Sequence, residues 1–282
     1  MRVREALAEA RSDWLMGADP DACGDAMPLL MAACGWSRER LYAALEDQLP
    51  EEAAGRLREL SLRRSRGEPL AYIVGSKEFM GLSFQVSPAV LVPRPETELM
   101  AEWALGWLST HSLEAPLAVD VGTGSGCLGI SLARYSPGLR VLAVDSSRAA
   151  LEVARNNAAR HVGAQVALAA GDLLNHVGRV ANLVCANLPY IPRALWPDLP
   201  LTVRGFEPAG ALIGGDLGIE LNERLLKDAR DVVVAPWALA LELDPSQAVY
   251  LQARAVQLYP GASVRLLDDL SGRARCLVIS GD

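Results

Sequence analysis

The sequence predicts an α/β protein with an open, mostly parallel β-sheet, preceded by a small domain made only of helices. From Pro116 onward, short apolar runs alternate with segments of helical periodicity, as in a parallel sheet with helices on both faces. The last two apolar runs lie too close together for a crossover helix, so we expect them to form a closing antiparallel pair. Before about residue 66, apolar residues recur only at spacings of three and four, which is typical of amphipathic helices.

The elements of the predicted sheet follow one another along the second part of the chain. We expect its strands at 117–121, 141–145, 166–170, 183–186, 239–243, 264–267 and 276–279. Helices are expected at 126–135, 148–160, 217–231 and 245–258. A further helix is expected from about Glu96 to Leu108, because Pro93 and Pro95 precede it.

Residues 68–95 differ from both flanking regions, because they combine alternating and β-branched residues with Gly75, Gly81 and Pro88. This composition predicts a β-hairpin between the two domains. We therefore predict three parts: a helical domain at 1–67, a β-hairpin linker at 68–92 and an α/β domain at 93–282. Within the helical domain, Ser37 is expected to cap the N-terminus of a helix.

Composition and charge exclude several classes of protein. The chain is 51% hydrophobic and 22% charged, as folded proteins are, and its net charge of −7 disfavours stable nucleic-acid binding. The basic segment from Arg56 to Arg66 is either a solvated helix face or a contact for an acidic or ribosome-associated partner. No apolar stretch reaches the roughly 18 residues that a membrane span needs, and the N-terminus is no signal peptide. We expect a cytoplasmic protein with no membrane contact.

Metal chemistry is not expected. The five cysteines form no Cys-x-x-Cys pair, and the three histidines are scattered along the chain. We therefore predict no metal site.

A glycine-rich loop follows the first predicted strand and precedes the helix expected at 126–135. Glycines let the backbone turn tightly and approach a ligand closely, and the start of the helix favours an anionic or acceptor-rich group. The same spacing also fits a dinucleotide-binding loop or a turn without a ligand. The residues expected to bind a cofactor here are Gly122, Thr123, Gly124, Ser125 and Gly126.

Two acidic positions favour an adenosine-containing cofactor. Asp145 ends the second predicted strand, where a carboxylate accepts the hydroxyls of a ribose, although it could instead cap the next helix. Asp172 and Leu173 follow the third strand, where the adenine edge would lie. A lone loop aspartate is usually only solvated, so this assignment depends on the other two sites.

The segment Asn187-Leu188-Pro189-Tyr190 decides among cofactors, because it follows a strand at the edge of the sheet where ligands bind. A nicotinamide dehydrogenase has no need of it. The lone pair of an amide nitrogen is delocalised, so an enzyme that methylates it needs two acceptors for its N–H bonds. The side-chain oxygen of Asn187 and the carbonyl of Leu188 supply them, while Pro189 stiffens the turn and Tyr190 offers a flat wall. We also expect Asn187 to contact the cofactor, which would be S-adenosylmethionine.

With these motifs, the chain resembles the release-factor glutamine methyltransferases over nearly its whole length. The resemblance includes Glu68-Pro-Leu-Ala-Tyr-Ile-Val-Gly75, Glu78-Phe-Met-Gly81, Val92-Pro-Arg-Pro-Glu-Thr-Glu98, the glycine loop, Asp145 and residues 187–190. It implies a Rossmann-like class I methyltransferase sheet and methylation of the glutamine in the Gly-Gly-Gln loop of peptide-chain release factors. It also implies that 1–67 recognises the substrate and that 93–282 binds S-adenosylmethionine. We expect a monomer.

Leu188 departs from the Asn-Pro-Pro-Tyr pattern of that family. Asn-Leu-Pro-Tyr is similar to the motif of the ribosomal-RNA adenine dimethyltransferases, so an adenine amine is a second possible acceptor. A glutamine of a ribosomal protein is a third, and a binding module without turnover is a fourth. Leucine still supplies the backbone carbonyl, and the acidic net charge favours a protein substrate.

Overall fold

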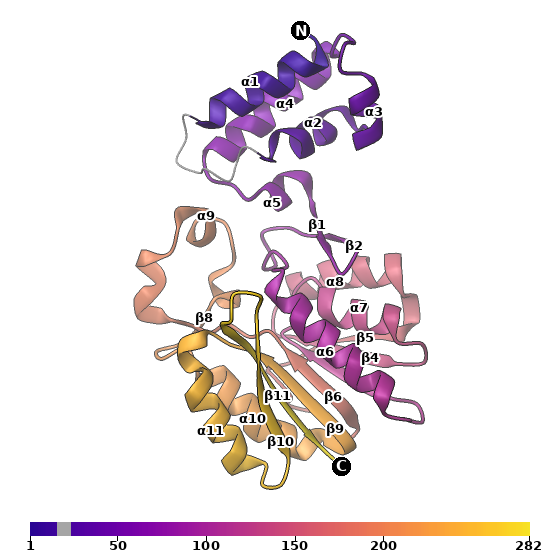
Figure 1. The fold of residues 1–282 in the computed structure, drawn as a ribbon, viewed down its shortest axis with the longest axis vertical. Coiled ribbons are helices and arrows are strands. Elements are labelled where there is room, and N and C mark those ends of the chain that lie inside the picture. The colour runs from indigo at the N-terminus through magenta and orange to yellow at the C-terminus, as the bar shows by residue number, and fades with distance from the viewer. Residues whose placement is uncertain (16–23) are drawn as a thin grey trace. The chain divides into compact units, whose positions relative to one another are not determined.

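The computed structural model describes residues 1–15 and 24–282, which form two compact units (Figure 1). The first unit comprises residues 1–76 with 200–206, and the second comprises 77–199 with 207–282. The proposed division of the chain by role, at residues 67 and 92, stays a prediction.

The first unit is helical, as predicted. Its helices are α1 (Val3–Leu15), α2 (Ala26–Cys34), α3 (Arg38–Ala43), α4 (Glu51–Ser65), α5 (Leu70–Val74) and the short α9 (Leu201–Arg204). Leu29, Leu30 and Leu41 are fully buried between them, so this unit has a core of its own. Ser37 caps α3, because its side chain accepts a hydrogen bond from the Arg40 N–H at 3.3 Å.

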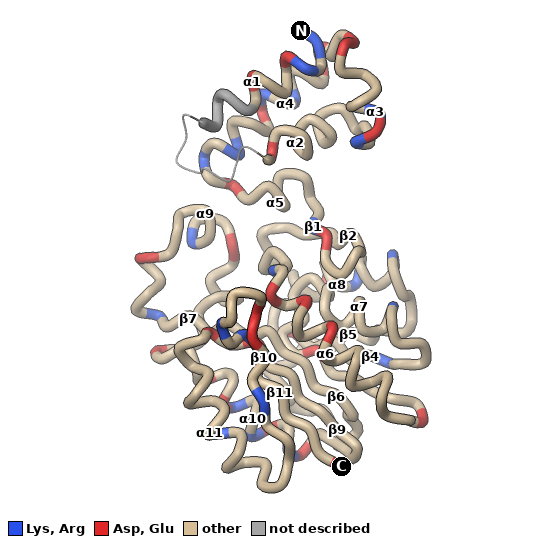
Figure 2. The backbone as a smooth tube through the Cα atoms, viewed as in Figure 1, with Lys and Arg blue, Asp and Glu red and all other residues tan. Residues whose placement is uncertain are grey.

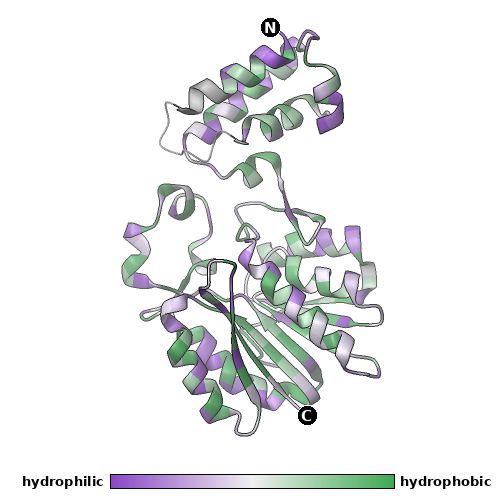
Figure 3. Cartoon of the chain, in the orientation of Figure 1, coloured by the Kyte–Doolittle hydropathy of each residue, from purple (hydrophilic) through white to green (hydrophobic). Residues whose placement is uncertain are grey.

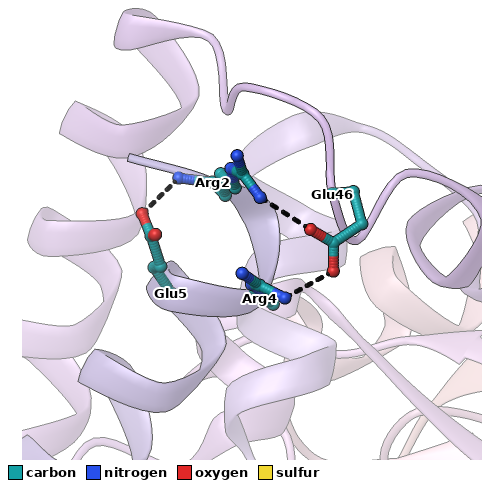
Figure 4. A network of polar contacts seen from close by, with 4 residues as sticks. All are labelled: Arg2, Arg4, Glu5 and Glu46. Carbon is teal, nitrogen blue, oxygen red and sulfur yellow. Dashed lines mark hydrogen bonds and ion pairs between the residues drawn. The ribbon is translucent and has the colours of Figure 1, made fainter.

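Charged side chains on this unit pair with one another. Arg2 and Arg4 both donate to the carboxylate of Glu46, at 2.8 and 2.7 Å (Figure 4). In the basic segment of α4, three of the arginines also pair with carboxylates of the same unit, as Arg56–Glu52, Arg63–Glu68 and Arg64–Asp25. Figure 2 shows both signs of charge mixed along these helices. Arg56 is about half exposed, whereas Arg64 is only 10% exposed, so the role of the basic segment stays a prediction.

The expected hairpin at 68–95 is shorter than predicted, because residues 70–74 form α5 instead of a strand. Pro69 begins this helix and Gly75, with a φ of 74°, ends it in the left-handed region. Ile73 packs into the core of the helical unit, so burial overrides the strand propensity of a β-branched residue. The hairpin itself consists of β1 (Ser76–Phe79) and β2 (Leu82–Gln85).

The second unit is built on a sheet of seven strands in the order β10-β11-β9-β6-β3-β4-β5 (Figure 1). These strands are β3 (Leu117–Val121), β4 (Arg140–Asp145), β5 (Val166–Ala170), β6 (Ala181–Ala186), β9 (Val233–Glu242), β10 (Ser263–Asp268) and β11 (Ala274–Gly281). The five from β9 to β5 run parallel, whereas β11 is antiparallel to both β9 and β10. The predicted parallel sheet with an antiparallel closing pair is confirmed.

Helices cover both faces of the sheet. Along β3 and β6, neighbouring residues alternate between two cores: Ala118 and Leu183 belong to one, Val119 and Val184 to the other. The first core also contains residues of α6 (Glu96–Thr110), α7 (Cys127–Tyr135) and α8 (Arg148–His161). The second core contains residues of α10 (Glu220–Val232) and α11 (Ala248–Leu258). The strands at the centre of the sheet are mainly hydrophobic (Figure 3), as burial on both faces requires.

Some boundaries and short elements differ from the prediction. β9 begins at Val233 and includes Pro236, which lies where the register between β6 and β9 shifts and a ladder hydrogen bond is not needed. The remaining elements were not predicted: η2 (Gly163–Gln165), β7 (Ile191–Pro192), η3 (Arg193–Asp198), η4 (Ala209–Ala211) and β8 (Ile213–Gly215). The helix expected at 245–258 begins with a 3₁₀ turn, η5 (Pro245–Gln247), and continues as α11. No helix in the described part of the chain is long and apolar enough to cross a membrane.

Candidate active site

A cavity of about 310 Å³ lies in the second unit, at the carboxyl ends of β3, β4, β5 and β6. Most of the predicted site residues line it: Gly122, Thr123, Gly124, Ser125, Asp145, Asp172, Leu173, Asn187, Leu188 and Pro189. Gly126 and Tyr190 are not among the lining residues. The fold therefore brings the glycine loop, both acidic positions and most of the 187–190 segment to one place.

Asp120, the fourth residue of β3, is hydrogen-bonded to the glycine loop and to α7. Its carboxylate accepts hydrogen bonds from the Thr123 hydroxyl at 2.6 Å and from the Gly129 N–H at 3.0 Å. Burial raises the pKa of Asp120 to about 6, although both hydrogen bonds act in the opposite direction. The loop ends at Gly126, whose φ of 81° places it in the left-handed region at the start of α7. This geometry fixes the loop before any ligand arrives.

Asp145 joins the glycine loop to the start of α8. One carboxylate oxygen accepts from the Gly124 N–H at 2.9 Å, and the other accepts from the Ser147 N–H at 2.8 Å. The alternative that Asp145 caps α8 is not what the structure shows, because Ser147 is the N-cap and accepts from the Ala150 N–H at 3.2 Å. Each carboxylate oxygen has a second lone pair, so Asp145 retains the capacity to accept hydroxyl groups.

Asp172 and Leu173 lie in the loop after β5 and line the same cavity. The Asp172 carboxylate pairs with Arg224 of α10 at 2.7 Å and remains about half exposed. Leu173 is buried and has a φ of 53°, in the left-handed region. Asp172 thus forms a surface ion pair while part of its carboxylate remains accessible.

Asn187 is tied to two residues that the sequence did not single out. Its side-chain Nδ2 donates to the hydroxyl of Thr97 at 2.9 Å, and that hydroxyl donates to Glu242 at 2.6 Å. Burial raises the pKa of Glu242 to about 7, although Thr97 and Asn187 act in the opposite direction as hydrogen-bond donors. A buried carboxylate thus lies behind the asparagine.

The next residues of the segment are held by packing. The Leu188 side chain is buried against the glycine loop, because a Cβ added at Gly122 would lie 2.9 Å from its Cδ2. Burial raises the pKa of Tyr190 to about 12, and its carbonyl accepts from Gln247 at 2.9 Å. The side chain of Leu188 therefore packs against the glycine loop, while its backbone carbonyl is the predicted acceptor.

Arg94 and Glu207 form an ion pair at the cavity and were not predicted as site residues. Arg94 lines it and forms a 2.5 Å ion pair with Glu207, which is buried and also accepts from the Val92 N–H at 3.2 Å. Arg94 belongs to the Pro-Arg-Pro-Glu-Thr-Glu string, which supports the family resemblance but does not by itself assign a role to Arg94. No local signal marked Glu207. Among the described residues, no group of three or more side chains could hold a metal ion.

Comparison with known proteins settles the family. Residues 5–75 match the PrmC N-terminal domain family, and residues 107–194 match the methyltransferase small domain family. A release factor glutamine methyltransferase of Moorella thermoacetica is 43% identical over 99% of this chain and 98% of that protein. The chain belongs to the release factor glutamine methyltransferase family. A second member, from Rhodopirellula baltica, is 36% identical over 90% of this chain and 87% of its own length.

The fold agrees with this family. A solved methyltransferase from Pyrococcus furiosus matches 78% of this chain and 98% of its own, with a TM-score of 0.52 and 20% identity. The predicted Rossmann-like class I methyltransferase fold is therefore confirmed, and S-adenosylmethionine is the methyl donor. The cavity fits that cofactor, because its lining offers backbone groups of a glycine loop and the carboxylates of Asp145 and Asp172.

Proposed function

We propose that the protein transfers the methyl group of S-adenosylmethionine to the side-chain amide nitrogen of the glutamine in the Gly-Gly-Gln motif of peptide-chain release factors. The observation that carries this proposal is the position of Asn187, Leu188 and Pro189 at the wall of the cavity that holds the glycine loop. Membership of the family supplies the substrate class.

The residues of the chain act by orientation. The Asn187 side-chain oxygen and the Leu188 carbonyl accept the two N–H groups of the substrate amide, which raises the electron density on its nitrogen. The cofactor supplies an electrophilic methyl group on a sulfonium centre. Because the donor is already activated, positioning and local electrostatics provide most of the catalysis.

We assign cofactor binding to Gly122, Thr123, Gly124, Ser125, Gly126, Asp145, Asp172, Leu173 and Asn187. Asp145 accepts the ribose hydroxyls through its remaining lone pairs, and the loop after β5 meets the adenine. Gly126 acts through the shape of the loop, since it does not line the cavity.

We further propose that residues 1–67 recognise the release factor, that 68–92 link the domains and that 93–282 carry out the reaction. The protein acts in the cytoplasm as a monomer and forms no stable complex with nucleic acid. The net charge of −7 supports the last point.

The test is methyl transfer from labelled S-adenosylmethionine to three acceptors: a release factor, a ribosomal protein and ribosomal RNA. We expect label in the release factor, and its loss with Asn187→Ala. Label mainly in ribosomal RNA would favour the adenine reading suggested by Leu188. Label mainly in the ribosomal protein would show that a ribosomal protein is the substrate. No label in any acceptor would favour a binding module without turnover.

A further inference from the structure

Three side chains from separate elements form one hydrogen-bonded line that ends at the cavity. Glu242 is the last residue of β9, Thr97 lies in the first turn of α6, and Asn187 follows β6. Glu242 and Thr97 are only 4% and 3% exposed, and Thr97 and Asn187 both line the cavity. Bulk water therefore has little access to the hydrogen bond between Thr97 and Glu242.

The direction of these hydrogen bonds follows from counting protons. Above its pKa of about 7, Glu242 is ionised and only accepts, so the single hydroxyl hydrogen of Thr97 is then directed at its carboxylate, 2.6 Å away. The Thr97 oxygen then has only lone pairs left for Asn187. It accepts from Nδ2 at 2.9 Å.

This direction decides which end of the Asn187 amide faces the cavity. The two ends of an amide have nearly the same shape, so packing alone hardly distinguishes them. With the amide turned over, Oδ1 would face the Thr97 oxygen and the Glu242 carboxylate with no hydrogen between them. The observed orientation places Nδ2 inward and leaves Oδ1 as the outward end.

We propose that Thr97 and Glu242 are positioning residues that hold the Asn187 side-chain oxygen toward the substrate amide. The proposal rests on the proposed function, in which Asn187 must accept an N–H. An Asn187 amide turned over would present hydrogens to the hydrogens of the substrate nitrogen. Thr97 of the Pro-Arg-Pro-Glu-Thr-Glu string is thereby assigned a role. Because its hydroxyl donates to Glu242, its oxygen can only accept from Asn187.

The variants for the test preserve shape as far as possible. Thr97→Val removes the hydroxyl and Thr97→Ser restores it. Glu242→Gln replaces an obligate acceptor with a group that either donates or accepts. Ser131→Ala is the matched control, because Ser131 is fully buried in α7 and its hydroxyl has no hydrogen-bond partner among the residues that the structure describes.

Three quantities are measured for each full-length variant: kcat and KM with a release factor, the affinity for S-adenosylmethionine by calorimetry, and the NMR signals of the Asn187 side-chain NH₂ group. Those signals are assigned by their absence in Asn187→Ala. Each substitution weakens or removes a hydrogen bond that favours one orientation of the Asn187 amide. We therefore expect kcat to fall about tenfold in Thr97→Val and Glu242→Gln. Cofactor affinity should stay near that of the wild type, and Thr97→Ser should restore most of the rate.

The NMR signals separate this proposal from the proposed function. In the wild type, the Asn187 NH₂ hydrogens should exchange slowly with solvent, and this protection should be lost in Thr97→Val and Glu242→Gln but kept in Ser131→Ala. A protected NH₂ in a protein that methylates no release factor would overturn the proposed function and leave the orientation standing. Unprotected hydrogens in the wild type, or unchanged kcat in Glu242→Gln, would overturn the orienting role. If Thr97→Val does not fold, Glu242→Gln decides.

Discussion

Gly126 is the position where the glycine loop should tolerate a side chain least. Its φ of 81° is costly for any residue with a Cβ, and an alanine Cβ would lie 2.7 Å from Ile130 Cδ1 and 3.3 Å from Ala154 Cβ. Ile130 and Ala154 are both fully buried, so a shift of either side chain must be accommodated by the surrounding core. Gly126→Ala should therefore disturb the loop at the start of α7.

The expected cost has two parts. Left-handed backbone costs a residue with a Cβ roughly 1–2 kcal/mol, and overpacking a core costs roughly 1–3 kcal/mol. The free energy of unfolding should therefore fall by about 2–5 kcal/mol in Gly126→Ala. Because the loop lines the cofactor cavity, affinity for S-adenosylmethionine should fall as well.

Two other glycines separate these parts. Gly163 has a φ of 59° but nothing within 4 Å of its added Cβ, so Gly163→Ala carries the backbone cost alone. Gly106 lies in α6 with open space and no positive φ, so Gly106→Ala should stabilise by up to about 1 kcal/mol. Urea unfolding measures stability, and calorimetry measures cofactor affinity. If Gly126→Ala cost no more than Gly163→Ala and left cofactor affinity unchanged, the steric argument would be refuted.

Three further predictions follow from the site. Asn187→Ala should lower the single-turnover methylation rate by about 10²–10³, whereas Leu188→Pro keeps the carbonyl and should cost far less; equal losses would argue against two acceptors. Asp145→Ala should weaken S-adenosylmethionine binding by roughly 1–3 kcal/mol in calorimetry, because the ribose hydroxyls lose their partner. Burial raises the pKa of Glu242 from 4.5 to about 7, so the folded state binds the extra proton between these values. The free energy of unfolding should be highest below pH 4.5. It should fall by about 3 kcal/mol as pH rises through about 7, because the folded state then loses a proton that it binds more tightly than the unfolded state. Urea unfolding between about pH 5 and pH 8 should show a shallower loss of stability in Glu242→Gln than in the wild type.

The centre of the sheet could be predicted because its strands are buried on both faces. A strand covered by helices on each side needs an almost continuous apolar run, and β3 and β6 each have one. The glycine loop could be predicted for a related reason. Its residues follow a strand directly, so the ligand edge of the sheet is fixed by chain order.

The α5 helix could not be predicted from local pattern. Tyr72, Ile73 and Val74 have high strand propensity, and only the packing of Ile73 and Val74 against the core of the helical unit favours a helix. Local propensity contains no information about such tertiary packing.

The buried partners of Asn187 were missed because they lie far away in sequence. Thr97 and Glu242 are 145 positions apart, and each alone is an unremarkable residue near the end of an element. Their hydrogen bond exists only once α6 packs beside the sheet. By contrast, Asn187 was visible because its neighbours Pro189 and Tyr190 complete a local motif.

The central claim is that this protein methylates a glutamine side-chain amide held by Asn187. Mass spectrometry of a release factor, after incubation with S-adenosylmethionine and the protein, tests it most directly. Fragment spectra should place a single methyl group on the side-chain nitrogen of the Gly-Gly-Gln glutamine, and methylation by Asn187→Ala should be about 10²–10³ slower. A methyl group on another residue, or equal methylation by Asn187→Ala, would contradict the account.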